Sequence, residues 1–134
     1  GTFNANPPAL TATKTTLDRL ESEPVYERIN TLGAELREFL SEKLYEREIE
    51  ATIQGIGSIS SIVLGHEGTE YTQSLHDQEY DPDRYYDLAE AARDAGLLFP
   101  PYHFQCIFMA EAHQKHMDEI KSRFCEALDE FQDQ

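Results

Sequence analysis

The amino-acid sequence predicts a two-layer α/β domain, because stretches with helical periodicity alternate with short stretches of strand character. The chain has 134 residues, of which 40% are hydrophobic, so it is long enough and apolar enough to form one domain with a core. It contains no internal repeat and no low-complexity segment. We therefore expect residues 1–134 to form a single domain.

Two helices are predicted in the first third of the chain. Asn6 suits an N-cap and Pro7 the first helical position, so the first helix is expected from about Pro7 to Leu20. Pro24 ends it, since proline cannot continue a helix easily. A second helix starts there and ends between residues 44 and 50, with an apolar stripe at Val25, Ile29, Leu32, Leu36, Phe39, Leu40 and Leu44.

Short strands and two further helices are expected after that. Asp81 and Pro82 are typical of a helix start, and Gly96 is typical of the residue that follows a last turn. Apolar residues at helical spacing predict a final helix over 113–131, with its stripe at Met117, Ile120, Phe124, Leu128 and Phe131. The other expected elements are strands at 51–54, 58–64, 97–99 and 104–109, a bend at 55–57 and a polar loop at 65–80.

The charge of the chain restricts its partners. The net charge of −15, from 26 acidic and 11 basic residues, argues against binding to nucleic acid or to an anionic membrane. No apolar run approaches the length of a membrane span. Cys106 and Cys125 lack a Cys-x-x-Cys spacing, which predicts reduced, structural cysteines in a cytoplasmic protein.

No metal site is expected. His113 and His116 share a helix face with Glu119 nearby, but their spacing includes no fixed third ligand. His66 and His76 lie in the polar loop, where solvated histidines are the commoner case.

The first eight residues form a polar loop that leads into a helix. Backbone N–H groups at a helix N-terminus attract anions, and Thr2 adds a hydroxyl group to this segment. An ordinary capped helix start that binds nothing is the commoner alternative. The residues alone leave both interpretations open.

The same segment, Gly1 to Pro7, resembles the G-T-[FY]-S-G-N-P segment of class-III, pyridoxal-phosphate-dependent aminotransferases, with the glutamate-1-semialdehyde aminomutase branch nearest. Val25 to Arg28, followed by Leu32-Gly33, resembles the family's V-Y-E-R-x-x-x-L-G helix. Phe108 to His113 resembles F-L-S-x-A-H. Gly57-Ser58 and the segment from Gly96 to Pro100 agree as well, so the matches follow the family order over nearly the whole chain.

The resemblance implies a fold, a cofactor and a partner. It implies a small C-terminal domain of a longer enzyme, with 1–24 as a bridging loop and helix, and 25–134 as a body whose short, mainly antiparallel sheet is covered by helices. In the family, the Thr of G-T-F reaches the phosphate of pyridoxal phosphate in the neighbouring subunit. Thr2, with Gly1 beside it, takes that place here. A homodimer and a small amino-acid or keto-acid substrate are therefore implied.

The chemistry of transamination is incomplete in this chain. Such an enzyme needs a lysine that bonds to the cofactor, an acid against the pyridine nitrogen and phosphate donors, and the family places the lysine, the acid and most donors upstream of G-T-F. The lysines here are all expected on polar helix faces: Lys14, Lys43, Lys115 and Lys121. We expect no catalytic residue in this fragment, which should be inactive alone although its parent is an enzyme.

The chain departs from the family pattern at two places. Asn4-Ala5 replaces Ser-Gly, and Gln105 stands where the aminomutase branch has a glutamate. The neutral amide weakens the case for the aminomutase reaction, and no arginine between residues 96 and 112 offers a partner for a substrate carboxylate. Two hypotheses remain: a C-terminal piece of an aminotransferase or aminomutase, and a stand-alone acidic α/β interaction domain without a cofactor.

Overall fold

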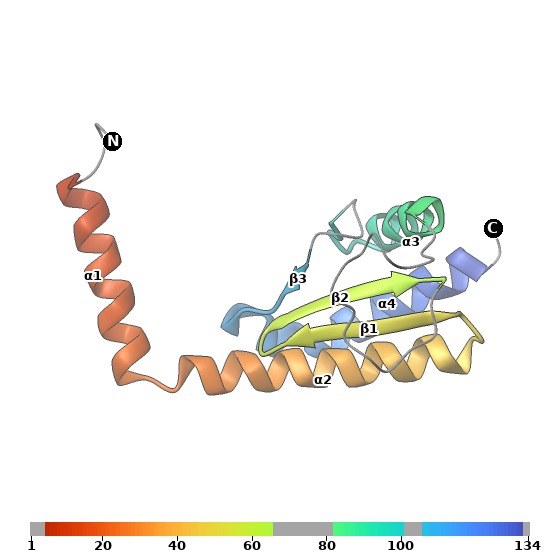
Figure 1. The fold of residues 1–134 in the computed structure, drawn as a ribbon, viewed down its shortest axis with the longest axis horizontal. Coiled ribbons are helices and arrows are strands. Elements are labelled where there is room, and N and C mark those ends of the chain that lie inside the picture. Colours follow the sequence, from red (N-terminus) through yellow and green to blue (C-terminus); the bar gives the residue numbers. More distant parts are fainter. Residues whose placement is uncertain (1–4, 66–81, 101–105, 133–134) are drawn as a thin grey trace.

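A computed structural model describes residues 5–65, 82–100 and 106–132 (Figure 1). The helices and strands are α1 (Pro7–Ser22), α2 (Val25–Glu46), β1 (Ala51–Ile56), β2 (Ile59–Leu64), α3 (Pro82–Asp94), β3 (Ile107–Phe108), the 3-10 helix η2 (Glu111–His116) and α4 (Met117–Gln132). The predicted α/β fold, a short antiparallel sheet covered by helices, is confirmed. No helix of the described ranges has the length and apolar character needed to cross a membrane.

The described sheet has three antiparallel strands in the order β1-β2-β3. β1 and β2 form a hairpin in which Ile56 is paired with Ile59. The bend predicted at 55–57 is therefore placed too early, because Gly55 and Ile56 belong to β1 and the turn lies at Gly57 and Ser58. Gly57 has a φ of +55°, a conformation that glycine adopts without a steric penalty.

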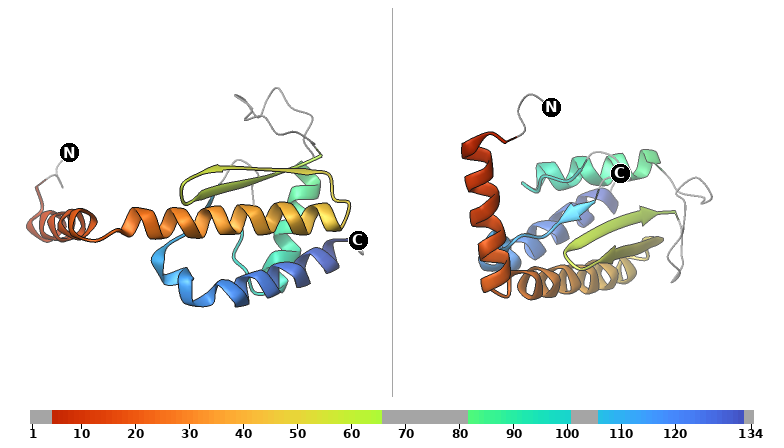
Figure 2. Two further views of the ribbon diagram at one scale, coloured as in Figure 1. Left: turned by 90° about the horizontal axis from the view of Figure 1, so that it is seen from below. Right: turned by 60° about the vertical axis from the view of Figure 1, so that its left-hand side comes forward.

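Helix α2 runs alongside the hairpin, and α4 packs against α3 and α2 (Figures 1 and 2). Arg37 of α2 donates hydrogen bonds to the carbonyl oxygens of Gly57, at 2.8 Å, and Ile59, at 2.9 Å. These bonds hold the turn of the hairpin on the helix. The largest fully buried side chains join all these elements into one core: Tyr85, Phe124, Leu40, Leu44, Ile62, Leu64, Leu88, Leu128 and Ser60.

In the second half of the chain, the structure differs from the elements that the sequence predicts. Residues 97–99 form no strand: Leu97 donates to Ala92 at the end of α3, Gly96 has a φ of +85°, and Leu98 is 96% exposed. Pro100 follows and has no N–H group to contribute to a sheet. Of the strand predicted at 104–109, the structure describes 106–109 and has only Ile107 and Phe108 in a strand, so Cys106 and Met109 were wrongly included. Residues 101–105 and most of the predicted loop at 65–80 lie outside the described residues. The last helix begins as the 3-10 turn η2.

Helix α1 extends away from the rest of the domain (Figure 1), and none of its residues is buried. It ends at Ser22, two residues later than predicted, and Pro24 separates it from α2. Asn6 occupies the N-cap position, but its side chain makes no capping hydrogen bond. The start of α1 therefore depends on Pro7 and on the backbone bond from Leu10 to Asn6.

Candidate functional site: the projecting helix and its joint

The two residues predicted to hold the cofactor phosphate, Gly1 and Thr2, lie outside the described residues, and so does Gln105. The described chain begins at Ala5, directly before α1. What the structure shows of the predicted site is therefore the helix that follows Thr2 and the surfaces and contacts that place this helix.

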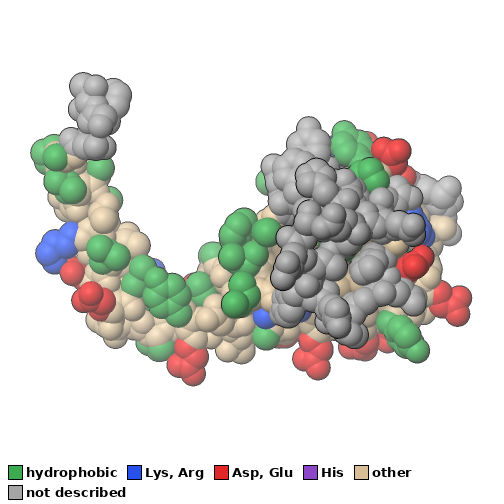
Figure 3. Space-filling model, viewed as in Figure 1, with side chains coloured by type: hydrophobic (Ala, Val, Ile, Leu, Met, Phe, Trp, Pro, Cys, Tyr) green, Lys and Arg blue, Asp and Glu red, His purple; other side chains and the backbone are tan. Residues whose placement is uncertain are grey.

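Helix α1 has an apolar side without a covering element in the described part of the chain. Leu10 and Leu17, one heptad apart on the same face, are 55% and 54% exposed. A helix of this length is marginally stable alone in water, so packing normally stabilises it. Hydrophobic side chains lie along α1 and also on the wall of the domain across the hollow from it (Figure 3). Such a surface is typical of one that contacts another part of a protein.

The sheet has an exposed apolar row at the end where the hairpin turns. Ile59 is paired directly with Ile56 on one side and with Phe108 on the other, so the three side chains share one face. Ile56 is 79% exposed and Phe108 is 63% exposed. A shallow groove of about 540 Å³ lies beside this row. The row is a second apolar surface available for contact with a protein.

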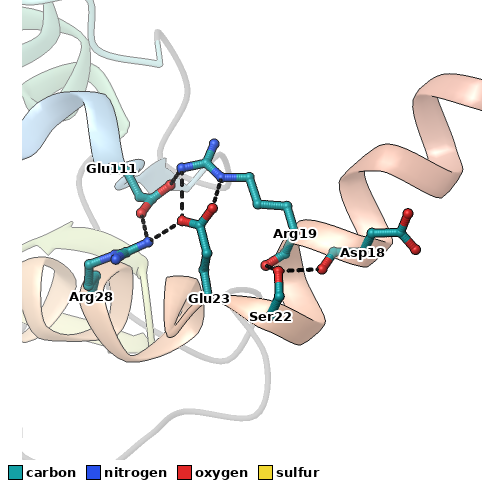
Figure 4. A network of polar contacts seen from close by, with 6 residues as sticks. All are labelled: Asp18, Arg19, Ser22, Glu23, Arg28 and Glu111. Atoms are coloured by element: carbon teal, nitrogen blue, oxygen red, sulfur yellow. Dashed lines mark hydrogen bonds and ion pairs between the residues drawn. The ribbon is translucent and has the colours of Figure 1, made fainter.

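A polar network joins α1 to the body of the domain (Figure 4). Glu111 of η2 accepts from Arg19 of α1, at 2.7 Å, and from Arg28 of α2, at 2.5 Å. Glu23, between the helices, pairs with the same arginines at 3.2 and 2.9 Å. Hydrogen bonds from Arg19 and then from Arg28 lower the pKa of Glu23, because they favour its ionised form. Two cations and two anions thus alternate at the joint between α1 and α2.

Sequence reasoning missed this network. Glu111 falls at the unspecified position of F-L-S-x-A-H, so no motif marks it. Arg19 and Glu111 are 92 residues apart in the chain, and only the fold brings them together. The single sequence feature near the network is Arg28, which is the last residue of the V-Y-E-R match.

The structure places the lysines where the sequence predicts them, on exposed or partly exposed helix faces. Lys14 pairs with Asp18, Lys43 with Glu46 at 2.7 Å and Lys121 with Glu35 at 2.6 Å, while Lys115 is exposed. Hydrogen bonds from Lys43 to Glu46 and Glu42 raise the pKa of Lys43. A lysine that bonds covalently to a carbonyl needs the opposite shift, so these contacts do not suit a covalent role.

The two histidines of the predicted pair have separate contacts. His113 Nδ1 accepts a hydrogen bond from the backbone N–H of Ala110 at 3.0 Å, and His116 Nδ1 lies 3.6 Å from Glu119. In the part of the chain that the structure describes, no three His, Cys, Asp or Glu residues are grouped so that they could hold a metal ion. Cys106 and Cys125 are free, partly exposed thiols.

Comparison with known proteins identifies the class of this chain. The model of the class-III aminotransferase family matches residues 1–131, so the chain belongs to that family. The glutamate-1-semialdehyde 2,1-aminomutase of Methanocella arvoryzae is 31% identical over 123 residues, which are 90% of this chain and 28% of the relative. The enzyme of the same name from Sulfurisphaera tokodaii is 30% identical over 96% of this chain and 29% of the relative. The chain therefore spans less than a third of the length of these relatives.

Solved structures agree with this assignment. The crystal structure of an omega-transaminase from Sphaerobacter thermophilus matches with a TM-score of 0.72 and 26% identity, over 98% of this chain and 30% of that protein. A structure described as a transaminase with PLP bound matches with the same TM-score of 0.72 at 22% identity, which supports the fold. Similarity over nearly the whole chain includes α1, so the projecting helix is part of the matched fold.

Proposed function

We propose that this chain is the C-terminal domain of a pyridoxal-phosphate-dependent aminotransferase or aminomutase, in which it completes the active site and the homodimer. The observation that carries the proposal is that the family match covers 1–131 while the chain spans less than a third of its relatives. The exposed faces of α1 and of the Ile56–Ile59–Phe108 row support it, because they provide apolar surface for the remainder of such an enzyme.

In this proposal, Thr2 and Gly1 bind the phosphate of a cofactor held in the neighbouring subunit. The N-terminal end of α1 follows them and contributes the positive end of a helix dipole, which favours a phosphate group. When bound, pyridoxal phosphate acts as an electron sink for reactions at the α-carbon of an amino acid. The part of this chain in the proposal is to bind and orient the phosphate. The lysine contacts described above support a covalent lysine in another part of the parent enzyme.

The substrate is proposed to be a small amino acid or keto acid, processed in the cytoplasm. The curated relatives carry the name of an aminomutase, which favours that reaction. Gln105, which replaces the glutamate of that branch, favours an ordinary transamination. Comparing the two activities of the parent enzyme, and then of a Gln105→Glu variant, distinguishes the two reactions.

The first test is the genomic reading frame. An upstream extension of several hundred residues, with a lysine shortly before Gly1, supports the proposal, on the scale of a larger multi-domain enzyme. A reading frame confined to these residues would favour the alternative, a stand-alone acidic interaction domain without a cofactor.

The second test is cofactor affinity in the parent enzyme after Thr2→Val. This change keeps the β-branched shape and removes one donor to a doubly charged phosphate, which is worth about 1.5–3 kcal/mol. The affinity for pyridoxal phosphate should fall roughly 10- to 150-fold. Thr15→Val, on the exposed side of α1, is the matched control and should leave the affinity unchanged. Equal affinities of wild type and Thr2→Val would mean that Thr2 only shapes a helix start.

A further inference from the structure

The direction of α1 is not set by apolar packing within the described chain. Only Glu23 and Pro24 separate α1 from α2, and no residue of α1 is buried. The side-chain contacts at the joint are the ion pairs of Arg19 with Glu23 and Glu111, and of Arg28 with Glu23. Among the described residues, the angle between α1 and the body of the domain therefore depends largely on these polar contacts and on the short connection.

Glu111 is the member of the network that comes from outside the two helices. One of its carboxylate oxygens, Oε2, binds Arg19 of α1, and the other, Oε1, binds Arg28 of α2. A carboxylate that uses both oxygens on two guanidinium groups fixes the separation and the relative direction of both arginines. Its side chain is 24% exposed, which is less than Arg19 at 57%, so solvent screens it less.

Glu111 is itself held firmly by the body of the domain. At the start of η2, the backbone N–H of Ala110 donates to His113 Nδ1 at 3.0 Å, and the His113 N–H donates to the Ala110 carbonyl at 2.9 Å. η2 leads directly into α4 at Met117, which is 6% exposed and belongs to the core. The Glu111 carboxylate is therefore attached to the core of the domain, and Arg19 connects α1 to it.

Helix length turns a small change at this joint into a large displacement. α1 has 16 residues, so at about 1.5 Å per residue it is about 24 Å long. Pro7 lies 12 residues before Arg19, about 18 Å along the helix, so a tilt of about 10° at Arg19 would move the N-terminal end by about 3 Å. Hydrogen bonds require donor–acceptor distances of roughly 2.7–3.2 Å, so a displacement of this size would break a hydrogen bond made by the residues that precede Pro7.

We infer that Glu111 is a positioning residue: by binding Arg19 and Arg28 together it sets the direction of α1, and so determines where the residues before α1 lie. The consequence for the cofactor rests on the proposed function, since it assumes that Thr2 binds the phosphate. The geometric part, that Glu111 orients α1, stands without it.

The test measures the direction of α1 in the full-length protein that contains this chain. Spin labels are attached at Ala9, near the N-terminal end of α1, and at Ser41 of α2, which are both exposed, after Cys106 and Cys125 are replaced by serine. Glu111→Gln keeps the side-chain shape and removes the charge. The distribution of label distances should broaden, and for a tilt of about 10° the label on α1 should move by about 3 Å. Cofactor dissociation, measured in parallel, should become about tenfold faster or more.

Two further variants separate positioning from folding. Arg19→Gln removes the ion pairs that Arg19 of α1 makes with Glu23 and Glu111, and it leaves the pairs of Arg28 with these two carboxylates in place. It should therefore cause the same shift in label distance with an unchanged melting temperature. Glu90→Gln is the matched control. It removes the carboxylate of an exposed ion pair between Glu90 and Arg93 on α3, which has the same length of 2.7 Å as the pair between Arg19 and Glu111. It should change neither the distances nor cofactor dissociation.

The readouts also separate this inference from the proposed function. Unchanged label distances in both Glu111→Gln and Arg19→Gln would overturn the inference, even if the parent enzyme binds pyridoxal phosphate tightly. Shifted distances with unchanged cofactor dissociation would overturn its consequence for the cofactor while leaving Glu111 as the residue that orients α1. A wild-type protein that binds no cofactor would contradict the proposed function, and the distance measurement would still decide the role of Glu111.

Discussion

Gly33 of α2 lies directly against the carbonyl oxygen of Gly57 in the turn between β1 and β2. A Cβ atom on Gly33 would stand 2.2 Å from that oxygen and 2.8 Å from the Cα of Ser58, well inside contact distance. Arg37, one turn further along the helix, donates a hydrogen bond to the same carbonyl. The glycine of the Leu-Gly step in the family motif, Gly33, is therefore explained by packing, because only glycine lets the helix and the hairpin approach this closely.

Gly33→Ala should destabilise the domain by about 1–3 kcal/mol, because the added methyl group meets backbone atoms that cannot rotate away. Urea unfolding followed by circular dichroism measures the change. Glu38→Ala, on the exposed side of the same helix, should stay within about 0.5 kcal/mol of wild type. An equally small effect of Gly33→Ala would mean that the helix and the hairpin can separate without cost.

Leu36→Ala should lower the free energy of unfolding by roughly 2–5 kcal/mol, because it leaves a cavity in the core. Leu36 is 4% exposed and belongs to the stripe of α2 that the sequence predicts. The matched control is Leu17→Ala on α1, where the side chain is 54% exposed, and the isolated chain should lose less than about 0.5 kcal/mol. Similar losses for both variants in urea melts would contradict the assigned core.

The domain should lose stability in alkaline solution through Tyr85. Burial, with a smaller contribution from Cys106, raises the pKa of Tyr85 to about 12, against about 10 in an unfolded chain. The folded state thus favours the neutral phenol, so its contribution is complete below pH of about 10 and is lost as the pH rises towards about 12, up to about 2.7 kcal/mol.

Denaturant unfolding of wild type and Tyr85→Phe across this pH range isolates the effect. The difference between the two proteins should change with pH, because the variant lacks the titrating group. Tyr45→Phe, at a position that is 85% exposed, should run parallel to wild type. Parallel curves for Tyr85→Phe would show that the phenol ionises as easily in the folded protein as in the unfolded chain.

The joint between α1 and α2 should weaken in acid. The pKa of Glu23 is lowered from 4.5 by its hydrogen bonds with Arg19 and Arg28, so its ionised form is favoured in the folded state. Its contribution is present above the unfolded pKa and is lost as the pH falls through the lower folded value. A carboxyl NMR titration should give Glu23 a pKa below 4.5 in wild type and a higher one in Arg19→Gln. The same pKa in both proteins would rule out Arg19 as the cause.

The isolated chain of 134 residues should bind pyridoxal phosphate weakly or not at all. Three of its lysines are paired with carboxylates on helix surfaces, and a covalent lysine needs a lowered pKa. Titration of the chain with the cofactor, followed by visible absorption, should show no saturable band. A band that saturates at one cofactor per chain would contradict the assignment of the lysine to another part of the enzyme.

Much of the fold follows from local patterns in the sequence. The apolar steps from Val25 to Leu44 predict α2, and Asp81-Pro82 with Gly96 predicts the bounds of α3, because helix periodicity and termination depend on residues close together in the chain. The two strands on either side of the bend were predicted for the same reason, with the bend displaced by a residue or two. The order of short motifs was enough to identify the family, which the comparison confirms over residues 1–131.

Tertiary structure decided what depends on residues far apart. Residues 97–99 have strand character, but no strand of the described ranges pairs with them, and a strand forms only where a neighbour offers its backbone groups. The apolar spacing of Leu10 and Leu17 predicts a helix, but only the packing shows that the described residues leave this face of α1 exposed. The contact between Arg19 and Glu111 cannot be read from the sequence, because two charged side chains become partners only when the fold brings them within hydrogen-bonding distance.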